Sequence, residues 1–390
     1  MIKKIHEYYL YLACYLAAFS YGSIYLLLKY TQKYLNGTAI NFGNFLLVSG
    51  ISAVLFLIIS TSLAKKFGAN LTSSVGILFC GFGVFGLVFL HEISFYYYLL
   101  AVFVGFGWSL YHASSSMFAL SPLIPDSEKG RYISLISVCV VLGTSSLPVV
   151  YSLGNKIGFH NLLIHLFLLS GITAFISAMI FIYLGKKFQI KKEKIPIKAN
   201  TLNLSILKTF SAYSFLMVFS GACVFSTMMM FQLSYANERN LNYAIFFIFY
   251  TIFVILSRIL FGGLLTKKNP IKNLPMILVI MLLSILIMIF NQANLYLYII
   301  SSSLLGISYG LAYPLIKTFG IKVAKEENRH QVLAVFTLSY FVGVYFFPIV
   351  ASHLFVDYSS TAYLLLLLFL VFIYLIISIL IQKKSLKYFT

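Results

Sequence analysis

Apolar runs of about 20 residues alternate with short polar segments along the whole chain. A helix needs about 20 apolar residues to cross the hydrocarbon core of a bilayer, because each residue adds only about 1.5 Å. Twelve runs approach or exceed this length, and we predict a membrane-spanning helix in each. The predicted spans are Tyr8–Leu28, Ile40–Ser60, Leu71–Leu90, Ser94–Phe118, Ile133–Leu153, Asn161–Leu184, Thr209–Leu233, Tyr243–Leu265, Leu274–Phe290, Leu295–Ile316, Val332–Leu354 and Thr361–Ile381.

The longest polar stretch, Gly185–Lys208, divides the chain into two parts of similar length. It holds seven of the 28 lysines and arginines and a single acid, Glu193. A lysine costs about 2.5–3.5 kcal/mol at the centre of a spanning helix, so this stretch must lie in water. We predict an all-α membrane protein with two pseudo-symmetric six-helix bundles, at residues 1–184 and 209–390, joined by a cytoplasmic basic linker at 185–208.

The composition excludes several classes of protein. The chain is 61% hydrophobic and 9% charged, whereas soluble domains carry about 25% charged residues. The four cysteines lie in apolar runs, so we expect neither a disulfide framework nor a metal site. The sequence contains no Walker loop and no cluster of acids and nucleophiles, and no cleavable signal peptide is evident. We therefore expect no cofactor, no ATP-driven pump and no enzyme.

The net charge of +19 is distributed unevenly between the two sides of the predicted membrane. With both termini inside, 23 of the 28 basic residues fall in inner segments and four in outer segments. This is the positive-inside bias, and it places both termini in the cytoplasm. It explains the charge without a nucleic-acid partner, and the inner loops can also bind anionic lipid headgroups.

The two halves repeat each other at a shift of about 200 residues. Gly143 and Pro148 in the fifth span match Gly343 and Pro348 in the eleventh. Three further pairs of segments follow in the same order: Leu63–Lys66 with Leu264–Lys267, Gly105–Trp108 with Gly306–Tyr309, and Glu128–Arg131 with Glu326–Arg329. Repeated membrane halves place a substrate site at their interface, near the bilayer midplane.

These motifs resemble the Major Facilitator Superfamily of secondary transporters over the whole chain. The family's signature after the second span is Gly-x-Leu-Ala-Asp-Arg-x-Gly-Arg, and Thr61–Ala69 reads TSLAKKFGA here. The second copy, Gly262–Asn269, reads GGLLTKKN. The resemblance implies gate or conformational roles for Lys65, Lys66, Gly68, Gly262 and Lys267. Neither copy contains the family's Asp, so the usual ion pair at the gate is in doubt.

The fifth span is similar to the family's antiporter signature, Gly-x-x-x-Gly-Pro-x-x-Gly-Gly. Gly143 and Pro148 fit that signature, but Leu147, Tyr151 and Ser152 stand where it has glycine. The resemblance implies conformational roles for Gly143 and Pro148, and for their repeats Gly343 and Pro348. It also favours export. The arginine that proton-linked drug exporters carry in the fourth span is replaced by Ala101.

All nine acids lie at or beyond the predicted ends of the spans. Proton-coupled carriers usually use a buried carboxylate whose pKa desolvation raises. The remaining candidates for proton coupling are His112 in the fourth span and His165 in the sixth. The alternative for each is a histidine that hydrogen-bonds to a neighbouring helix.

Arg258 is the strongly charged residue that falls within a predicted span. An arginine inside the membrane suggests a function, and we consider binding of an anionic substrate. The alternative is a structural arginine that donates to carbonyls beside Gly262 and Gly263. Lys317 lies at the inner end of the tenth span, where we expect its side chain to reach toward the interface.

Two aromatic pairs occupy matching places in the halves. Trp108 and His112 share one face of a helix, and so do Tyr309 and Tyr313. Rings with one polar edge each suit a partly apolar organic solute, and ordinary helix packing is the alternative. Tyr21 in the first span and Asn44 in the second are further candidates for substrate contact.

The sequence thus predicts a secondary active transporter in a plasma or inner membrane. It would move a small organic solute by alternating access, in the direction of efflux, and would act as a monomer. One alternative is uptake or facilitated diffusion of an organic anion that engages Arg258. A second is a membrane scaffold or receptor that does not transport.

Overall fold

The computed structural model describes residues 4–115, 118, 124, 126–187, 209–262, 269–324 and 329–389. These residues form α-helices together with a 3₁₀ helix and a π-helix, and the described ranges contain no strand. Residues 188–208 of the predicted linker lie outside them.

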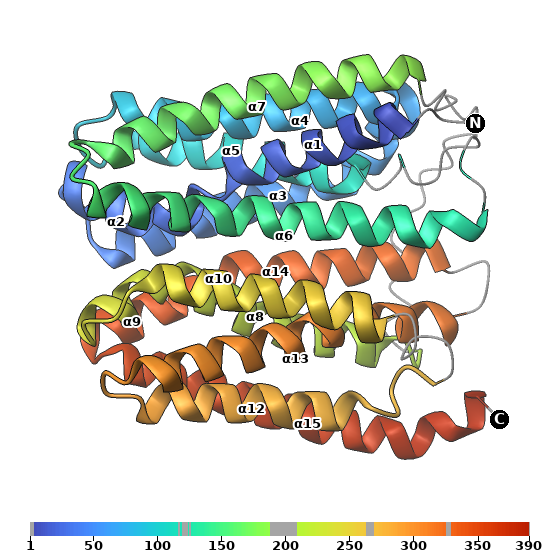
Figure 1. Ribbon diagram of the computed structural model, residues 1–390. Helices are drawn as coiled ribbons and strands as arrows, with labels where there is room; N and C mark the ends of the chain where they lie inside the picture. Colours follow the sequence, from blue (N-terminus) through green and yellow to red (C-terminus); the bar gives the residue numbers. More distant parts are fainter. Residues whose placement is uncertain are drawn as a thin grey trace. The chain divides into compact units, whose positions relative to one another are not determined.

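By its internal contacts the chain divides into two compact units, residues 1–198 and 199–390. The N-terminal unit contains α1 (Lys4–Tyr21), α2 (Ile24–Tyr34), α3 (Ala39–Phe67), α4 (Ala69–Gly86), η1 (Leu87–Phe89), α5 (Phe95–Ser115), α6 (Asp126–Lys156) and α7 (Leu162–Lys187). The C-terminal unit contains α8 (Ala212–Met230), α9 (Gln232–Glu238), α10 (Tyr243–Ser257), the π-helix η4 (Arg258–Gly262), α12 (Leu274–Phe290), α13 (Leu295–Lys322), α14 (Arg329–Asp357) and α15 (Ser360–Phe389) (Figure 1).

Each unit packs its helices in the same order. In the N-terminal unit α1 contacts α6 and α7, and in the C-terminal unit α8 contacts α14 and α15. Helix α5 packs against both α3 and α4, as α13 packs against α10 and α12. The pair α4 and α7 likewise corresponds to α12 and α15. The internal repeat read from the sequence is therefore also a repeat of helix neighbours.

Ten helical stretches in the described part of the chain are long and apolar enough to cross a membrane. The shorter apolar helix α12 has 17 residues. Helix α5, which covers most of the predicted fourth span, is not among the ten, because its tyrosines, Trp108 and His112 make it less hydrophobic than its neighbours. The fold is that of a polytopic membrane protein, and the total of twelve crossings stays a prediction.

Glycines at repeated positions bring the same helices into close contact in both units. A Cβ on Gly105 of α5 would overlap the carbonyl oxygen of Ser49 on α3. A Cβ on Gly306 of α13 would lie 2.5 Å from the carbonyl oxygen of Tyr250 on α10. Both partners of this contact are shifted by 201 residues between the units, so the repeat holds at the level of single atoms.

Gly143 and Gly343 make a second repeated contact. Gly143 of α6 lies against α1, where a Cβ would come within 2.7 Å of the Ala18 side chain. Gly343 of α14 lies against α8, where a Cβ would come within 2.7 Å of the Ala222 side chain. Removing the side chain at these positions lets the helix backbones approach, as small residues do between membrane helices.

The predicted first span, Tyr8–Leu28, is not one continuous helix, because α1 ends at Tyr21 and α2 begins at Ile24. The break lies against the neighbouring helix α6. Pro148 has no N–H, so the carbonyl of Thr144, four residues earlier, loses its helical donor. Gly22 packs onto this carbonyl, and a Cβ there would lie 2.7 Å from its oxygen. The break therefore sits against a carbonyl of α6 that lacks its helical donor.

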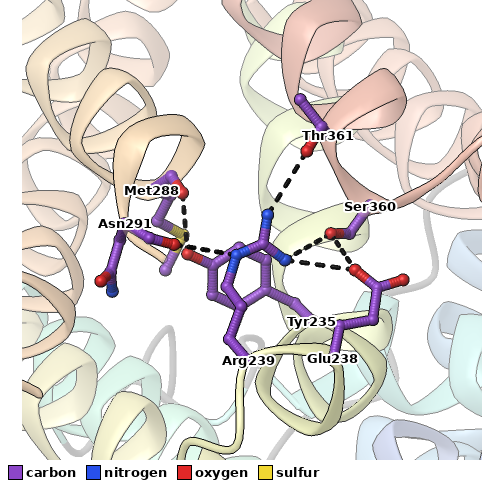
Figure 2. A network of polar contacts seen from close by, with 7 residues as sticks. All are labelled: Tyr235, Glu238, Arg239, Met288, Asn291, Ser360 and Thr361. Atoms are coloured by element: carbon purple, nitrogen blue, oxygen red, sulfur yellow. Dashed lines mark hydrogen bonds and ion pairs between the residues drawn. The ribbon is translucent and has the colours of Figure 1, made fainter. Parts of the chain in front are cut away.

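Arg239 joins three helices of the C-terminal unit at the ends of α9, α12 and α15 (Figure 2). Its Nε donates to the Asn291 carbonyl at 2.9 Å, Nη1 donates to Ser360 Oγ at 2.6 Å, and Nη2 donates to Thr361 Oγ1 at 3.3 Å. Nη1 also lies 3.2 Å from the Glu238 carboxylate, which accepts a further hydrogen bond from Ser360. We call this set of contacts the Arg239 clamp.

The Tyr235 ring packs against the guanidinium group of the Arg239 clamp (Figure 2). The Arg239 guanidinium lies over this ring at 4.1 Å from the centroid. Burial raises the pKa of Tyr235 to about 12, so the phenol keeps its proton and donates to the Met288 carbonyl at 2.8 Å. The clamp therefore combines a cation–π contact with hydrogen bonds to two helix ends.

We expect Arg239→Gln to destabilise the protein by about 3 kcal/mol, because it takes a charged donor from the part-buried Asn291 carbonyl and from the Ser360 and Thr361 hydroxyls. Thermal unfolding in detergent measures this as a fall in Tm of roughly 5–10 °C. The matched control is Lys33→Gln, which removes an exposed cation from α2 and should change stability by less than about 0.5 kcal/mol. Equal Tm values for the two variants would contradict the clamp.

Candidate functional site

Two aromatic rings stack in the middle of the N-terminal unit. Tyr21, the last residue of α1, lies parallel to Trp108 of α5, with ring centroids 3.8 Å apart and an interplanar angle of 13°. Both side chains are buried. The predicted candidates Tyr21 and Trp108 are thus in direct contact, although they lie on different helices.

A second stack lies in the C-terminal unit. Tyr309 of α13 is parallel to Phe225 of α8, with centroids 4.7 Å apart and an angle of 12°. Tyr313 follows one turn along α13 and packs edge-on against Phe336 and Tyr340 of α14, at 5.6 and 5.5 Å. The predicted pair of Tyr309 and Tyr313 therefore belongs to a larger aromatic cluster.

The two stacks occupy repeated positions. Trp108 and Tyr309 are 201 residues apart, and Tyr21 and Phe225 are 204 residues apart. The latter shift also relates Ala18 to Ala222, the contacts of the two repeated glycines. The sequence prediction missed Phe225, one of 38 phenylalanines. The signal that identifies it is this second shift, which applies to the first span of each half.

Arg258 is held by a hydrogen bond to a carbonyl that a proline leaves free on the neighbouring helix α13. Pro314 interrupts the hydrogen bonds of α13 and leaves the Gly310 carbonyl without its helical donor. Arg258 Nε donates to this carbonyl at 3.2 Å. The structural alternative predicted carbonyls beside Gly262 and Gly263, but this bond goes to Gly310. Gly263 lies outside the described residues.

Arg258 reaches the aromatic cluster, because the Gly310 carbonyl to which it donates lies between Tyr309 and Tyr313 along α13. Arg258 is the first residue of the π-helix η4 and is half-buried. A π-helical turn re-aims side chains and is frequent at functional sites. The structure therefore combines three of the predicted substrate contacts in one region of the C-terminal unit.

The space inside the C-terminal unit behind Tyr309 and Tyr313 is small. A cavity of about 10 Å³ is lined there by these tyrosines together with Gly221, Met281 and Tyr374. This volume holds about one water molecule. An organic solute therefore cannot occupy that cavity in this conformation.

The remaining predicted contact and proton-coupling residues do not all join the stacks. His112 is half-buried one turn beyond Trp108, and Asn44 is half-buried on α3. His165 lies in the first turn of α7 with its side chain exposed, away from the middle of that helix. Of the two histidines, His112 is the one placed near the aromatic side chains.

The candidate gate residues are described only in part. Gly68 separates α3 from α4 with φ of +93°, a conformation that favours glycine. Lys66 is exposed, with Nζ 5.3 Å from the Phe67 ring centroid. Gly262 ends the π-helix η4. Lys267 and the side chain of Lys65 lie outside the described part of the chain.

Trp108 is the single tryptophan of the chain, so its fluorescence reports on the N-terminal stack. We expect Tyr21→Leu to uncover one face of the indole and to increase the quenching of its emission by acrylamide. The lost stack should cost about 0.5–1.5 kcal/mol. Tyr9→Leu changes an exposed ring of the same helix and should leave quenching unchanged. Equal quenching in both variants would show that the stack does not form.

The comparisons with known proteins agree with this geometry. The sequence profile of the Major Facilitator Superfamily matches residues 10–348. The chain belongs to this superfamily. No curated protein sequence matches the chain significantly.

Solved structures of transporters resemble this superfamily member over nearly their whole length. The nucleoside transporter NupG matches with a TM-score of 0.69 and 14% identity, covering 99% of this chain and 100% of the other. A peptide transporter POT bound to sulfate matches with a TM-score of 0.77 and 15% identity, covering 98% and 94%. The POT family transporter PepTSo matches at 0.74 and 14%, covering 100% and 99%. At these identities the likeness establishes the shared fold. Together with the family, it indicates an integral membrane transporter and not an enzyme.

Proposed function

We propose that this superfamily member is a secondary active transporter that moves a small organic solute by alternating access, in the direction of efflux. The observation that carries the proposal is the pair of stacked rings at repeated positions, Tyr21 with Trp108 and Phe225 with Tyr309. Flat, partly polar rings suit an organic solute. The similar structures are named as transporters of nucleosides and peptides, which are also organic solutes.

The direction rests on the fifth span of the repeat and its packing. Gly143 lies against α1. Pro148 leaves the Thr144 carbonyl without its helical donor, and Gly22 packs against that carbonyl. A proline and two glycines at this contact give α1 and α6 a joint at which helices can bend. The antiporter-like Gly143 and Pro148 favour efflux. In this proposal both termini lie in the cytoplasm, and the basic inner loops lie beside anionic headgroups.

Uptake or facilitated diffusion of an organic anion is the second candidate. It is favoured by one observation, the hydrogen bond from Arg258 to the Gly310 carbonyl, which places this cation near Tyr309 and Tyr313 on α13. In this mode the anion gradient itself would drive movement. A proton would not be required, so the role proposed for His112 separates the two candidates.

Transport by the purified chain in vesicles tests the proposal. Vesicles containing the protein would be loaded with a panel of organic solutes and a pH-sensitive dye, and protein-free vesicles would serve as the control. We expect protein-dependent release of at least one solute, accelerated by an inward proton gradient. A rate of solute exchange that does not change with the proton gradient would favour facilitated diffusion. A complete lack of flux across the panel would contradict transport.

A further inference from the structure

Lys317 lies well inside α13 and has no polar partner among the described residues. The helix continues to Lys322, so Lys317 is five residues, or about 7.5 Å, from its end. Its side chain is half-buried and makes no hydrogen bond or ion pair with any residue that the structure describes. Charged side chains inside a membrane segment are costly and are usually paired. A half-buried cation that no described residue pairs is a candidate to bind an anion.

The surroundings of Lys317 indicate what kind of anion this is. Tyr309, Tyr313 and Lys317 follow one another at intervals of four residues and so share one face of α13. Arg258 donates a hydrogen bond to the carbonyl of Gly310, which lies between Tyr309 and Tyr313 on the same helix. This part of the C-terminal unit thus gathers two cations, two phenols and the ring of Phe225, which stacks on Tyr309.

We propose that Lys317 and Arg258 bind the carboxylate of an aromatic acid and that Tyr309 and Tyr313 contact its ring. The inference rests on the proposed transport function and names its substrate class. An arginine fork and a lysine ammonium are both suited to a carboxylate, the former through paired N–H donors and the latter as a point charge. A ring beside the carboxylate meets the tyrosine rings, which prefer offset or edge-on contacts.

A lipid headgroup offers the same anionic oxygens from a different source. The inner end of a spanning helix is where basic residues meet headgroup phosphates. Two features favour the solute over the lipid: the place of Lys317 on the tyrosine face of α13, and Arg258, which donates to Gly310 of the same helix. The experiment below uses lipids without net charge so that the two sources give different results.

The probe is 4-nitrobenzoate, with the neutral 4-nitrobenzamide as its matched analogue. Binding is measured on the full-length protein in phosphatidylcholine nanodiscs. We expect Lys317→Met to lower the affinity for 4-nitrobenzoate at least tenfold and to leave the amide unchanged. The same variant should raise the Tm, because it removes a half-buried charge that no described residue pairs. Lys322→Met, at the exposed end of the same helix, should alter neither quantity. Lys317→Arg keeps the charge and should retain binding within threefold.

If Lys317 had a purely structural role, the Lys317→Met variant would not show both a lower affinity and a higher Tm. Unchanged affinity in Lys317→Met would overturn the proposal, as would equal binding of the acid and the amide by the unaltered protein. An effect of the substitution that needs anionic lipid would assign Lys317 to headgroups and would also overturn it. If the vesicle panel reveals flux of some other solute while 4-nitrobenzoate does not bind, the inference fails and transport stands. If no solute moves at all, the transport proposal fails, and the inference that rests on it fails as well.

Discussion

Replacing Arg258 with glutamine is expected to reduce transport of an organic anion at least tenfold and to destabilise the protein by about 1–3 kcal/mol. The first effect follows from the loss of the cation that is bonded to Gly310, between Tyr309 and Tyr313. The second follows because the Gly310 carbonyl loses the donor that replaces its missing helical hydrogen bond. Flux in reconstituted vesicles measures the first, and thermal unfolding in detergent measures the second.

A double variant separates the two roles of Arg258. Pro314→Ala returns an N–H to position 314, so the Gly310 carbonyl regains a donor within its own helix. Arg258→Gln with Pro314→Ala should therefore recover stability without recovering transport. Arg258→Lys keeps the charge without the planar fork and should transport at an intermediate rate. Full transport by a correctly folded Arg258→Gln protein would eliminate the binding role.

Replacing Gly105 with alanine is expected to leave little folded protein. The added Cβ would overlap the Ser49 carbonyl oxygen, and a backbone atom cannot move aside as the end of a side chain can. Helices α3 and α5 would have to separate, at a cost we expect to exceed about 3 kcal/mol. Gly306→Ala should have the same effect through the Tyr250 carbonyl. The folded fraction after solubilisation, measured by size-exclusion chromatography, checks both variants.

The matched control for the glycine variants is Gly221→Ala on α8. A Cβ at this position would meet only the Tyr374 side chain, at 3.7 Å, which is ordinary van der Waals contact. This variant should fold like the unaltered protein. A stable Gly105→Ala protein would show that α3 and α5 do not touch through their backbones, and the repeated contact described above would be wrong.

The fold was largely predictable because hydrocarbon imposes a strict pattern on the sequence. Apolar runs located most of the helices, and the spacing of Gly105 and Gly306 revealed the repeat. The break at Gly22 was missed, although Ser20, Gly22 and Ser23 interrupt the apolar run at this point. Gly22 packs against a carbonyl on α6 that Pro148 leaves without a helical donor, and this contact becomes visible only once the partner helix is known.

The candidate site was predictable where a residue is chemically unusual. Arg258, Trp108 and Tyr309 stand out as a charge in a span and as aromatic residues at repeated positions. Phe225 and Lys317 do not stand out, since one is a common apolar residue and the other lay near a predicted boundary. The acceptor of Arg258 is set by Pro314 on another helix. Contacts between helices, not properties of single residues, account for what the sequence left open.

The break between α1 and α2 preserves a trace of how the gene diverged. Tyr21 and Thr31 are ten residues apart, whereas their counterparts Phe225 and Gln232 are seven apart. Thr31 pairs with Tyr97 just as Gln232 pairs with Tyr298, so both ends of the interval are fixed by equivalent contacts. After the ancestral duplication one copy therefore gained or lost three residues, nearly one helical turn. The break at Gly22 lies within the interval whose length differs between the two copies.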